Sequence, residues 1–138
     1  MQVKKWLGAT LALVFALGCL SGCGGKLPEG FSRDQVIDQA KAASQLLEEE
    51  DYQGLVECWR PDLRDDQLEE KLRQAWEGLG GPELGERSEY TAEEAVGKED
   101  DGGEPYVAVL LIAKYERGKV QYTISLDREG QLVGFYLK

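Results

Sequence analysis

Histidine is absent from this chain of 138 residues, and its absence excludes several kinds of site. Without an imidazole side chain there is no Ser-His-Asp or Cys-His nucleophile pair and no histidine ligand for a metal. Any general acid or base must be a carboxylate, a tyrosine, a lysine or a thiol. We assign no catalytic residue, no metal site and no cofactor from the sequence.

Cysteine is scarce, with residues at positions 19, 23 and 58 only. The first two lie in the N-terminal segment discussed below, which leaves Cys58 alone in the rest of the chain. The mature protein therefore has no intramolecular disulfide, and its fold must rest on its core. Because free cysteine is usually buried, we interpret Cys58, next to Trp59, as a small core residue, with a reactive thiol as the alternative.

Positive charge is the third shortage, with 16 basic residues against 26 acidic ones. Loss of residues 1–22 would remove Lys4 and Lys5 but no acid, so the mature chain is two units more negative than the whole. An acidic surface opposes binding to nucleic acid and to anionic lipid headgroups. We expect no nucleic-acid partner and a domain that does not lie flat on a membrane.

The longest apolar run lies at the N-terminus, where two lysines precede residues 6–20 and small residues lead into Cys23. This order is typical of a secretory signal peptide. The alternative is an uncleaved transmembrane helix, but such a span needs about 20 predominantly apolar residues and this run is shorter. The sequence favours a signal peptide over residues 1–22.

The end of that segment, Leu20-Ser21-Gly22-Cys23, resembles the lipobox of bacterial lipoproteins. The resemblance implies that the Cys23 sulfur carries a diacylglyceryl group and that cleavage leaves Cys23 as the mature N-terminus. Two acyl chains suffice for stable anchoring. Cys19 is a second candidate, but it lacks the branched residue three positions earlier. We predict an exported protein, lipid-anchored to the bacterial membrane through Cys23, with its domain on the extracytoplasmic side.

After a tether over residues 23–31, apolar residues recur at helical spacing and then at a spacing of two. We expect helices from Ser32 to about Glu48, from Asp51 to Trp59, and from a cap at Asp65 or Asp66 to Leu79. Strands are expected over residues 86–96, 106–115 and 119–127, with a last strand after the turn at 128–130. Helices followed by strands joined through short turns predict one α+β domain over residues 32–138. Its helices should pack on an antiparallel meander.

Several of these segments carry a family resemblance. It rests on Asp51-Tyr52, Pro61-Asp62-Leu63, Leu68, Leu72, Ala75-Trp76-Glu77, Leu79 and Gly85. The chain resembles an uncharacterised domain of exported bacterial proteins, domain-of-unknown-function family 3887. That family is similar to the cystatin-like cone of SnoaL and nuclear transport factor two. The resemblance implies N-terminal helices in the concavity of a curved antiparallel sheet of about four strands. Glu86-Arg87 departs from the more apolar family pattern, and no family activity carries over.

In a cone of this kind a pocket can open between the helices and the sheet. The candidate lining residues are aromatic: Tyr52, Trp59, Trp76, Tyr106, Tyr122 and Tyr136. An aromatic cavity with a few polar tips suits a small apolar ligand. The alternative is that Trp59 and Trp76 simply fill the core, since both lie on apolar stripes.

The acidic residues give no clear site. Glu57 and Glu77 adjoin the tryptophans in sequence, but a step of one residue turns about 100° around a helix, so we expect both to be solvated. The acidic segment 99–104 could attract calcium. Its acids are adjacent rather than spaced as in an EF-hand loop, which favours a solvated turn. No acid clearly interrupts an apolar stripe.

Three functions remain open. The first is a non-catalytic, membrane-tethered module that binds an envelope protein or a small apolar ligand. The second is a cone-fold enzyme of the isomerase, dehydratase or cyclase type acting on a small apolar substrate, which requires an inward carboxylate or tyrosine in an open cavity. The third is a structural envelope subunit that forms a homodimer through its sheet.

Overall fold

The computed structural model describes residues 27–138, so the signal peptide and Cys23 lie outside the described residues. Three helices come first, α1 (Arg33–Glu48), α2 (Tyr52–Glu57) and α3 (Leu68–Gly78), with short 3₁₀ turns η1 (Pro61–Leu63) and η2 (Gly81–Glu83). Four strands follow: β3 (Arg87–Glu99), β4 (Pro105–Tyr115), β5 (Gly118–Leu126) and β6 (Leu132–Leu137). The predicted α+β order, helices before strands, is confirmed.

The starts of α1 and α2 follow from side-chain caps. The Ser32 hydroxyl accepts a hydrogen bond from the Gln35 N–H at 3.5 Å, and the Asp51 carboxylate accepts one from the Gly54 N–H at 3.0 Å. Each cap satisfies a backbone donor that has no partner within the helix. The predicted cap of α3 is wrong. Asp65 accepts from the Gln67 N–H at 2.9 Å and so closes the preceding turn, and α3 begins at Leu68.

The sheet is a meander in the order β3-β4-β5-β6, with every neighbouring pair antiparallel. The first strand runs three residues beyond its expected end, to Glu99. Its pairing with β4 shifts register between Arg87 and Glu89 and again between Tyr90 and Ala92. Such β-bulges bend a strand and break its alternation, which explains why the sequence pattern of β3 is weak.

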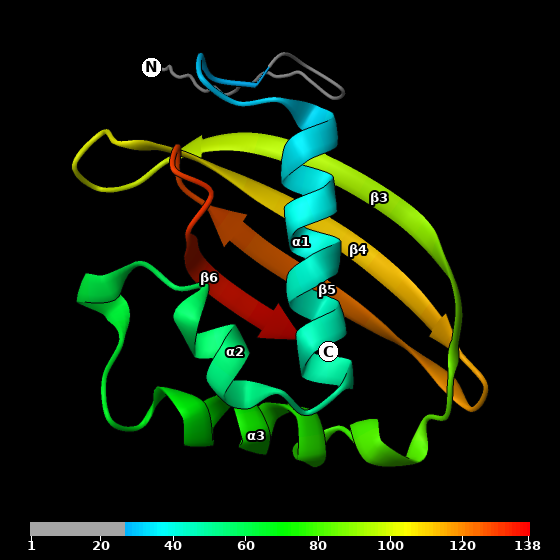
Figure 1. The fold of residues 1–138 in the computed structure, drawn as a ribbon. Coiled ribbons are helices and arrows are strands. Elements are labelled where there is room, and N and C mark those ends of the chain that lie inside the picture. Colours follow the sequence, from blue (N-terminus) through cyan, green and yellow to red (C-terminus); the bar gives the residue numbers. More distant parts are fainter. Residues whose placement is uncertain (1–26) are drawn as a thin grey trace, which may run out of the picture.

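The helices cover one face of the sheet, with α1 lying across β3, β4 and β5 (Figure 1). The core forms between them because each strand presents alternate apolar residues to the helices. Ala40 and Leu47 of α1 and Val109, Leu111 and Ile124 of the strands are fully buried. Helical spacing from Leu68 and Leu72 predicts that Ala75 of α3 faces the core, but Ala75 is exposed.

The opposite face of the sheet carries the other residue of each alternating pair. Thr123 and Ser125 of β5 lie there, next to Tyr136 and Gly134 of β6 respectively. Tyr136 is 72% exposed, which makes it the most exposed large hydrophobic side chain of the described residues. The pocket described below forms at one end of this face.

Within residues 27–138, no helix combines the length and the apolar character needed to cross a lipid bilayer.

Candidate functional site

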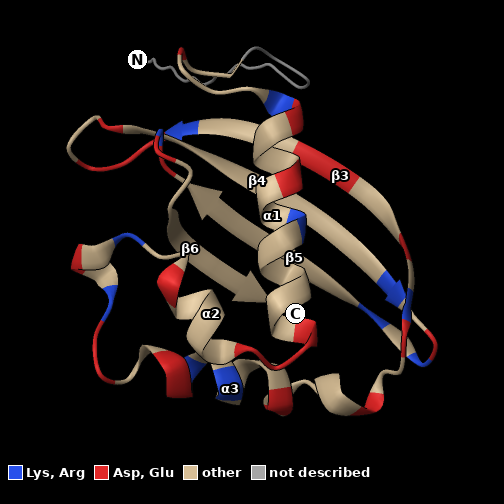
Figure 2. Ribbon diagram, in the orientation of Figure 1, with Lys and Arg blue, Asp and Glu red and all other residues tan. Residues whose placement is uncertain are grey.

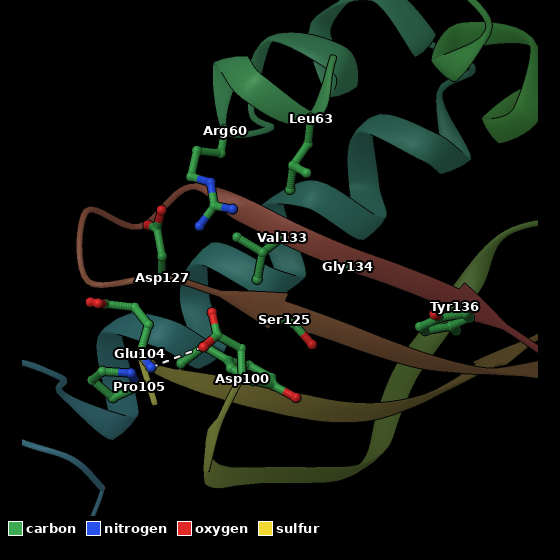
Figure 3. Close-up of a pocket in the computed structure, with 11 residues that line it drawn as sticks. Arg60, Leu63, Asp100, Glu104, Pro105, Ser125, Asp127, Val133, Gly134 and Tyr136 are labelled. Atoms are coloured by element: carbon green, nitrogen blue, oxygen red, sulfur yellow. Dashed lines mark hydrogen bonds between the residues drawn. The ribbon is translucent and has the colours of Figure 1, made fainter. Parts of the chain in front are cut away.

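A pocket of about 310 Å³ lies at the end of the sheet where the β3–β4 turn, the end of β5 and the start of β6 meet the segment after α2 (Figure 3). Its lining residues come from all four regions: Arg60, Leu63, Asp100, Glu104, Pro105, Tyr106, Ser125, Asp127, Val133, Gly134 and Tyr136. Pockets that bind small molecules range from about 300 to 1,000 Å³. This one therefore suits a small group, such as a single side chain.

The β3–β4 turn supplies the carboxylates of Asp100 and Glu104 to the pocket, and hydrogen bonds within the turn hold Asp100 in place. One oxygen of Asp100 accepts hydrogen bonds from the N–H groups of Gly102 and Glu104, both at 2.9 Å. Gly103 has a φ of 82°, a conformation that glycine adopts without steric cost. The segment predicted as a solvated acidic turn is a closed hairpin turn, and its acids are conspicuous in Figure 2.

Asp127 occupies the other side of the pocket and is only 7% exposed. Its Oδ1 accepts from the N–H groups of Glu129 at 3.0 Å and Gln131 at 2.9 Å, so it closes the β5–β6 turn. Its Oδ2 is buried and has no hydrogen-bond partner among the described residues. Most buried polar atoms are paired, so this oxygen is an exception that asks for an explanation.

Arg60 reaches the pocket because the chain after α2 pairs with the edge of β6. The Arg60 N–H donates to the Leu132 carbonyl at 3.0 Å, and the Leu132 N–H donates to the Cys58 carbonyl at 2.9 Å. The Arg60 guanidinium is paired with Asp62, with 2.7 Å between Nε and Oδ1. This hydrogen bond lowers the pKa of the Asp62 carboxyl. The one cation of the lining thus already has a counterion outside the pocket.

The predicted aromatic pocket residues do not gather in one place. Tyr106 and Tyr136 line the pocket. Tyr52, Trp76 and Tyr122 lie in the core, and half-buried Trp59 packs against it. The Tyr52 hydroxyl and both indole N–H groups are buried without a partner among the described residues.

Contacts in the core explain how two of these aromatic residues are held. The Tyr52 ring lies under the Arg73 guanidinium, at 4.8 Å from the ring centre, and burial raises the pKa of its hydroxyl. Trp76 packs edge-on against Tyr115, with ring centres 6.3 Å apart. These contacts are typical of side chains that fill a core.

A polar chain crosses the interior between α1 and the sheet, where no inward acid was expected. Glu48 is the last residue of α1, a position at which the sequence predicts an exposed acid, and this prediction is wrong. Its side chain is 17% exposed, and its Oε2 lies 2.8 Å from Nε of Arg87 in a salt bridge. The same carboxylate oxygen accepts a hydrogen bond from the Tyr115 hydroxyl. The Tyr115 and Tyr122 hydroxyls are 2.6 Å apart. Burial raises the pKa of both tyrosines far above the ordinary value.

Cys58 is half-buried, and its thiol donates weakly to the Gly54 carbonyl at 3.5 Å. Burial raises the pKa of the thiol, which lowers the fraction of reactive thiolate at neutral pH. Both features agree with a structural cysteine. Glu57 and Glu77 are exposed, as predicted.

Sequence reasoning missed most of the pocket. The alternation in β5 placed Ser125 and Asp127 away from the core face but gave no sign that Asp127 is buried. One signal was present: aspartate followed three residues later by glycine, as at Asp127 and Gly130, marks a turn closed by the carboxylate. It predicts the turn and not the cavity. Arg60 and Leu63 carry no such signal, since only tertiary packing brings them to β6.

Across the described residues, no group of three or more cysteine, aspartate or glutamate side chains is placed to hold a metal ion. The acids of the pocket line a cavity wide enough for an organic group. They do not converge on one point as ligands of a bare ion must.

The fold and the pocket define a small α+β domain whose helices cover one face of an open antiparallel sheet. The chain belongs to the family described as "Protein of unknown function (DUF3887)", which matches residues 40–135. The family predicted from residues such as Ala75-Trp76-Glu77 is confirmed. The likeness of that family to the SnoaL cone stays a resemblance.

Among solved structures, the chain is similar to the NMR structure of a protein from Ruminococcus gnavus ATCC 29149. The two share 29% sequence identity with a TM-score of 0.69, over 80% of this chain and 94% of that chain. No curated protein matches this chain. The comparisons thus show the family and the fold, and their descriptions name no activity.

Proposed function

We propose that this protein is a lipid-anchored, non-catalytic binding module on the extracytoplasmic side of the membrane, and that the pocket beside β6 is its ligand site. The observation that carries the proposal is Asp127, whose buried Oδ2 lacks a partner at the wall of a 310 Å³ pocket. Leaving a buried acceptor unpaired costs about 1–3 kcal/mol, more for a charged group. A ligand that supplied the missing donor would recover this energy on binding.

The proposed anchor at Cys23 sets which end of the domain meets the membrane. Leu27 is four residues beyond Cys23, a reach of about 14 Å at most. The next residues pack at the pocket end of the sheet: a Cβ added to Gly97 would lie 2.6 Å from Pro28, and one added to Gly30 would lie 3.6 Å from Arg128. The pocket would therefore open close to the bilayer, in a position to meet ligands at the membrane surface.

The enzyme alternative receives less support from the interior. An acid or base on this fold needs access to a substrate, and the interior tyrosines with raised pKa, Tyr52, Tyr115 and Tyr122, are 5%, 4% and 0% exposed. The hydroxyls of Tyr115 and Tyr122 form a hydrogen bond with each other, and the Tyr115 hydroxyl also contacts the Glu48 carboxylate. This arrangement stabilises a core.

The proposal is tested by blocking the pocket in the full-length protein solubilised in detergent. A set of small amines, carboxylates and alcohols is screened by the shifts they cause in the amide resonances of the lining residues. Ser125→Phe places a ring on the pocket face of β5, and Thr123→Phe is the matched control, since Thr123 shares that face without lining the pocket. We expect at least one compound to bind the wild type and the control but not Ser125→Phe. Equal binding by Ser125→Phe, or no binder in the whole set, contradicts the proposal.

A further inference from the structure

The charge of the pocket is negative although it contains an arginine. Asp100, Glu104 and Asp127 line it, against Arg60 alone. The guanidinium of Arg60 is already neutralised by Asp62, which does not line the pocket. Charges in a concave site act through less water than charges on an open surface, so their field is felt more strongly inside. The pocket therefore attracts a positive group and repels an anion.

We infer that the ligand of this pocket is an organic cation, an ammonium or guanidinium group on a short apolar stem, such as a lysine or arginine side chain of a partner or a small amine. The inference rests on the proposed function, in which the pocket is the ligand site. It assigns the charge of the ligand.

Such a cation would supply the hydrogen-bond donor that the Asp127 carboxylate lacks. Its Oδ1 is held by two backbone N–H groups, so the carboxylate cannot turn to find another partner without giving up the β5–β6 turn. Its Oδ2 remains without a donor. Because Oδ2 is covered in the free protein, a ligand N–H reaches it only when a lining side chain shifts. Arg60, which is half-buried, lies next to Asp127 in Figure 3. A hydrogen bond between an ammonium and a carboxylate is about twice as strong as one between neutral groups.

The remaining wall suits the stem of the cation. Tyr106 and Tyr136 contribute aromatic rings, and Leu63, Pro105 and Val133 add apolar surface. The face of a tyrosine ring attracts a cation within about 6 Å of its centre. A bare metal ion fits less well, since calcium requires six to eight oxygens at about 2.3–2.6 Å and the described residues form no such cluster.

The test compares three probes of nearly equal size: n-butylammonium, 1-butanol and butyrate. Each is titrated into the full-length protein in detergent, and the amide resonances of Ser125 and Gly134 are followed. We expect n-butylammonium to bind about tenfold more tightly than 1-butanol, the ratio that corresponds to one charge-assisted hydrogen bond, and butyrate not to bind. Added salt should weaken the binding of n-butylammonium but not that of 1-butanol.

Three variants locate the effect. Asp127→Asn keeps an oxygen to close the turn and removes the charge, and it should abolish the preference for n-butylammonium over 1-butanol. Glu104→Gln should reduce the preference for n-butylammonium severalfold. The Glu104 side chain makes no hydrogen bond in the turn, so this change should leave the turn intact. Asp101→Asn is the matched control, because it removes a charge from the same turn without lining the pocket. It should change the preference little.

The outcomes separate the inference from the function on which it rests. If 1-butanol or butyrate binds in the pocket as tightly as n-butylammonium, the inference is wrong while the pocket remains a ligand site. The inference is also wrong if Asp101→Asn weakens n-butylammonium as much as Glu104→Gln does, since the effect then belongs to the overall charge. If none of the three probes moves the lining amides, the cation assignment fails, and the Ser125→Phe screen decides separately whether the pocket binds anything.

Discussion

At the scale of single residues, the carboxylates of Glu48 and Asp127 are more buried than their positions in the sequence suggest. Glu48 ends a helix and Asp127 ends a strand, and such places normally leave an acid in water. Both are drawn inward by hydrogen bonds that only the fold supplies: Tyr115 and Arg87 hold Glu48, and two backbone N–H groups hold Asp127. One stabilises the interior, and the other shapes the pocket.

The buried pair Tyr115 and Tyr122 makes the free energy of unfolding fall as the pH rises into the alkaline range. Burial raises the pKa of Tyr115 and Tyr122 above the ordinary value of about 10, so the unfolded chain loses these protons first as pH rises. The stabilising contribution is complete below pH 10 and is lost progressively above it. Tyr122→Phe should cost about 1–2 kcal/mol at pH 8, because Tyr115 loses a partner, and should make the decline above pH 10 shallower.

Urea denaturation of the full-length protein in a mild detergent between pH 8 and pH 11 measures this effect. Tyr136→Phe serves as the control, since its hydroxyl is on an exposed residue and should leave the pH dependence unchanged. Parallel curves for the wild type and Tyr122→Phe would show that the buried pair is not responsible.

At the scale of elements, the junction between α3 and η2 shows what a glycine can be required for. Gly81 is buried, and a Cβ there would collide with the indole ring of Trp76. Gly78, the last residue of α3, would place a Cβ in open space. Only Gly81 of these two glycines is therefore required by the packing of its neighbours.

Alanine substitutions should separate them. Gly81→Ala is expected to destabilise the protein by about 1–3 kcal/mol, because Trp76 must leave its packed position. Gly78→Ala should leave stability unchanged or raise it by up to about 0.5–1 kcal/mol, because alanine favours the helix. Thermal unfolding followed by tryptophan fluorescence compares the two, and similar losses in both variants would refute the assigned contact.

The helices and strands also differ in how far the sequence predicted them. The helix start at Ser32 and the alternation in β5 depend on neighbouring residues, and these predictions are confirmed. The sequence pattern of β3 is weak because bulges interrupt its alternation, and the bulges depend on pairing with β4. The cap of α3 failed because aspartates at 65 and 66 offered two turns to close, and the chain closed the earlier one.

At the scale of the whole molecule, the proposed anchor and the fold together orient the domain. If Cys23 carries the lipid, the β3–β4 turn lies near the bilayer and α3 lies at the far end of the domain (Figure 1). In a Cys58→Ser background, a fluorophore on Asp101→Cys should be quenched by lipid-attached quenchers more strongly than one on Glu70→Cys. Equal quenching at both positions would contradict the orientation.

The anchor has its own control. Cys23→Ala should stop acylation and move the protein out of the membrane fraction, whereas Cys19→Ala should change neither. Acylation that continued in Cys23→Ala would show that Cys19 is the modified residue.

The sequence by itself determined the family, the order of elements and the alternation that divides core from surface, because these depend on residues close together in the chain. It left two interpretations of its aromatic residues open, a shared pocket or, for Trp59 and Trp76, simple core filling. The fold separates them: Tyr52, Trp76 and Tyr122 lie in the core, Trp59 packs against it, and Tyr106 and Tyr136 line the pocket. Tertiary structure alone decided the pocket. The segment bearing Arg60 reaches it by pairing with β6, and Asp127 is buried there by a turn whose surroundings come from distant parts of the chain. Burial and convergence depend on long-range packing, which local patterns do not encode.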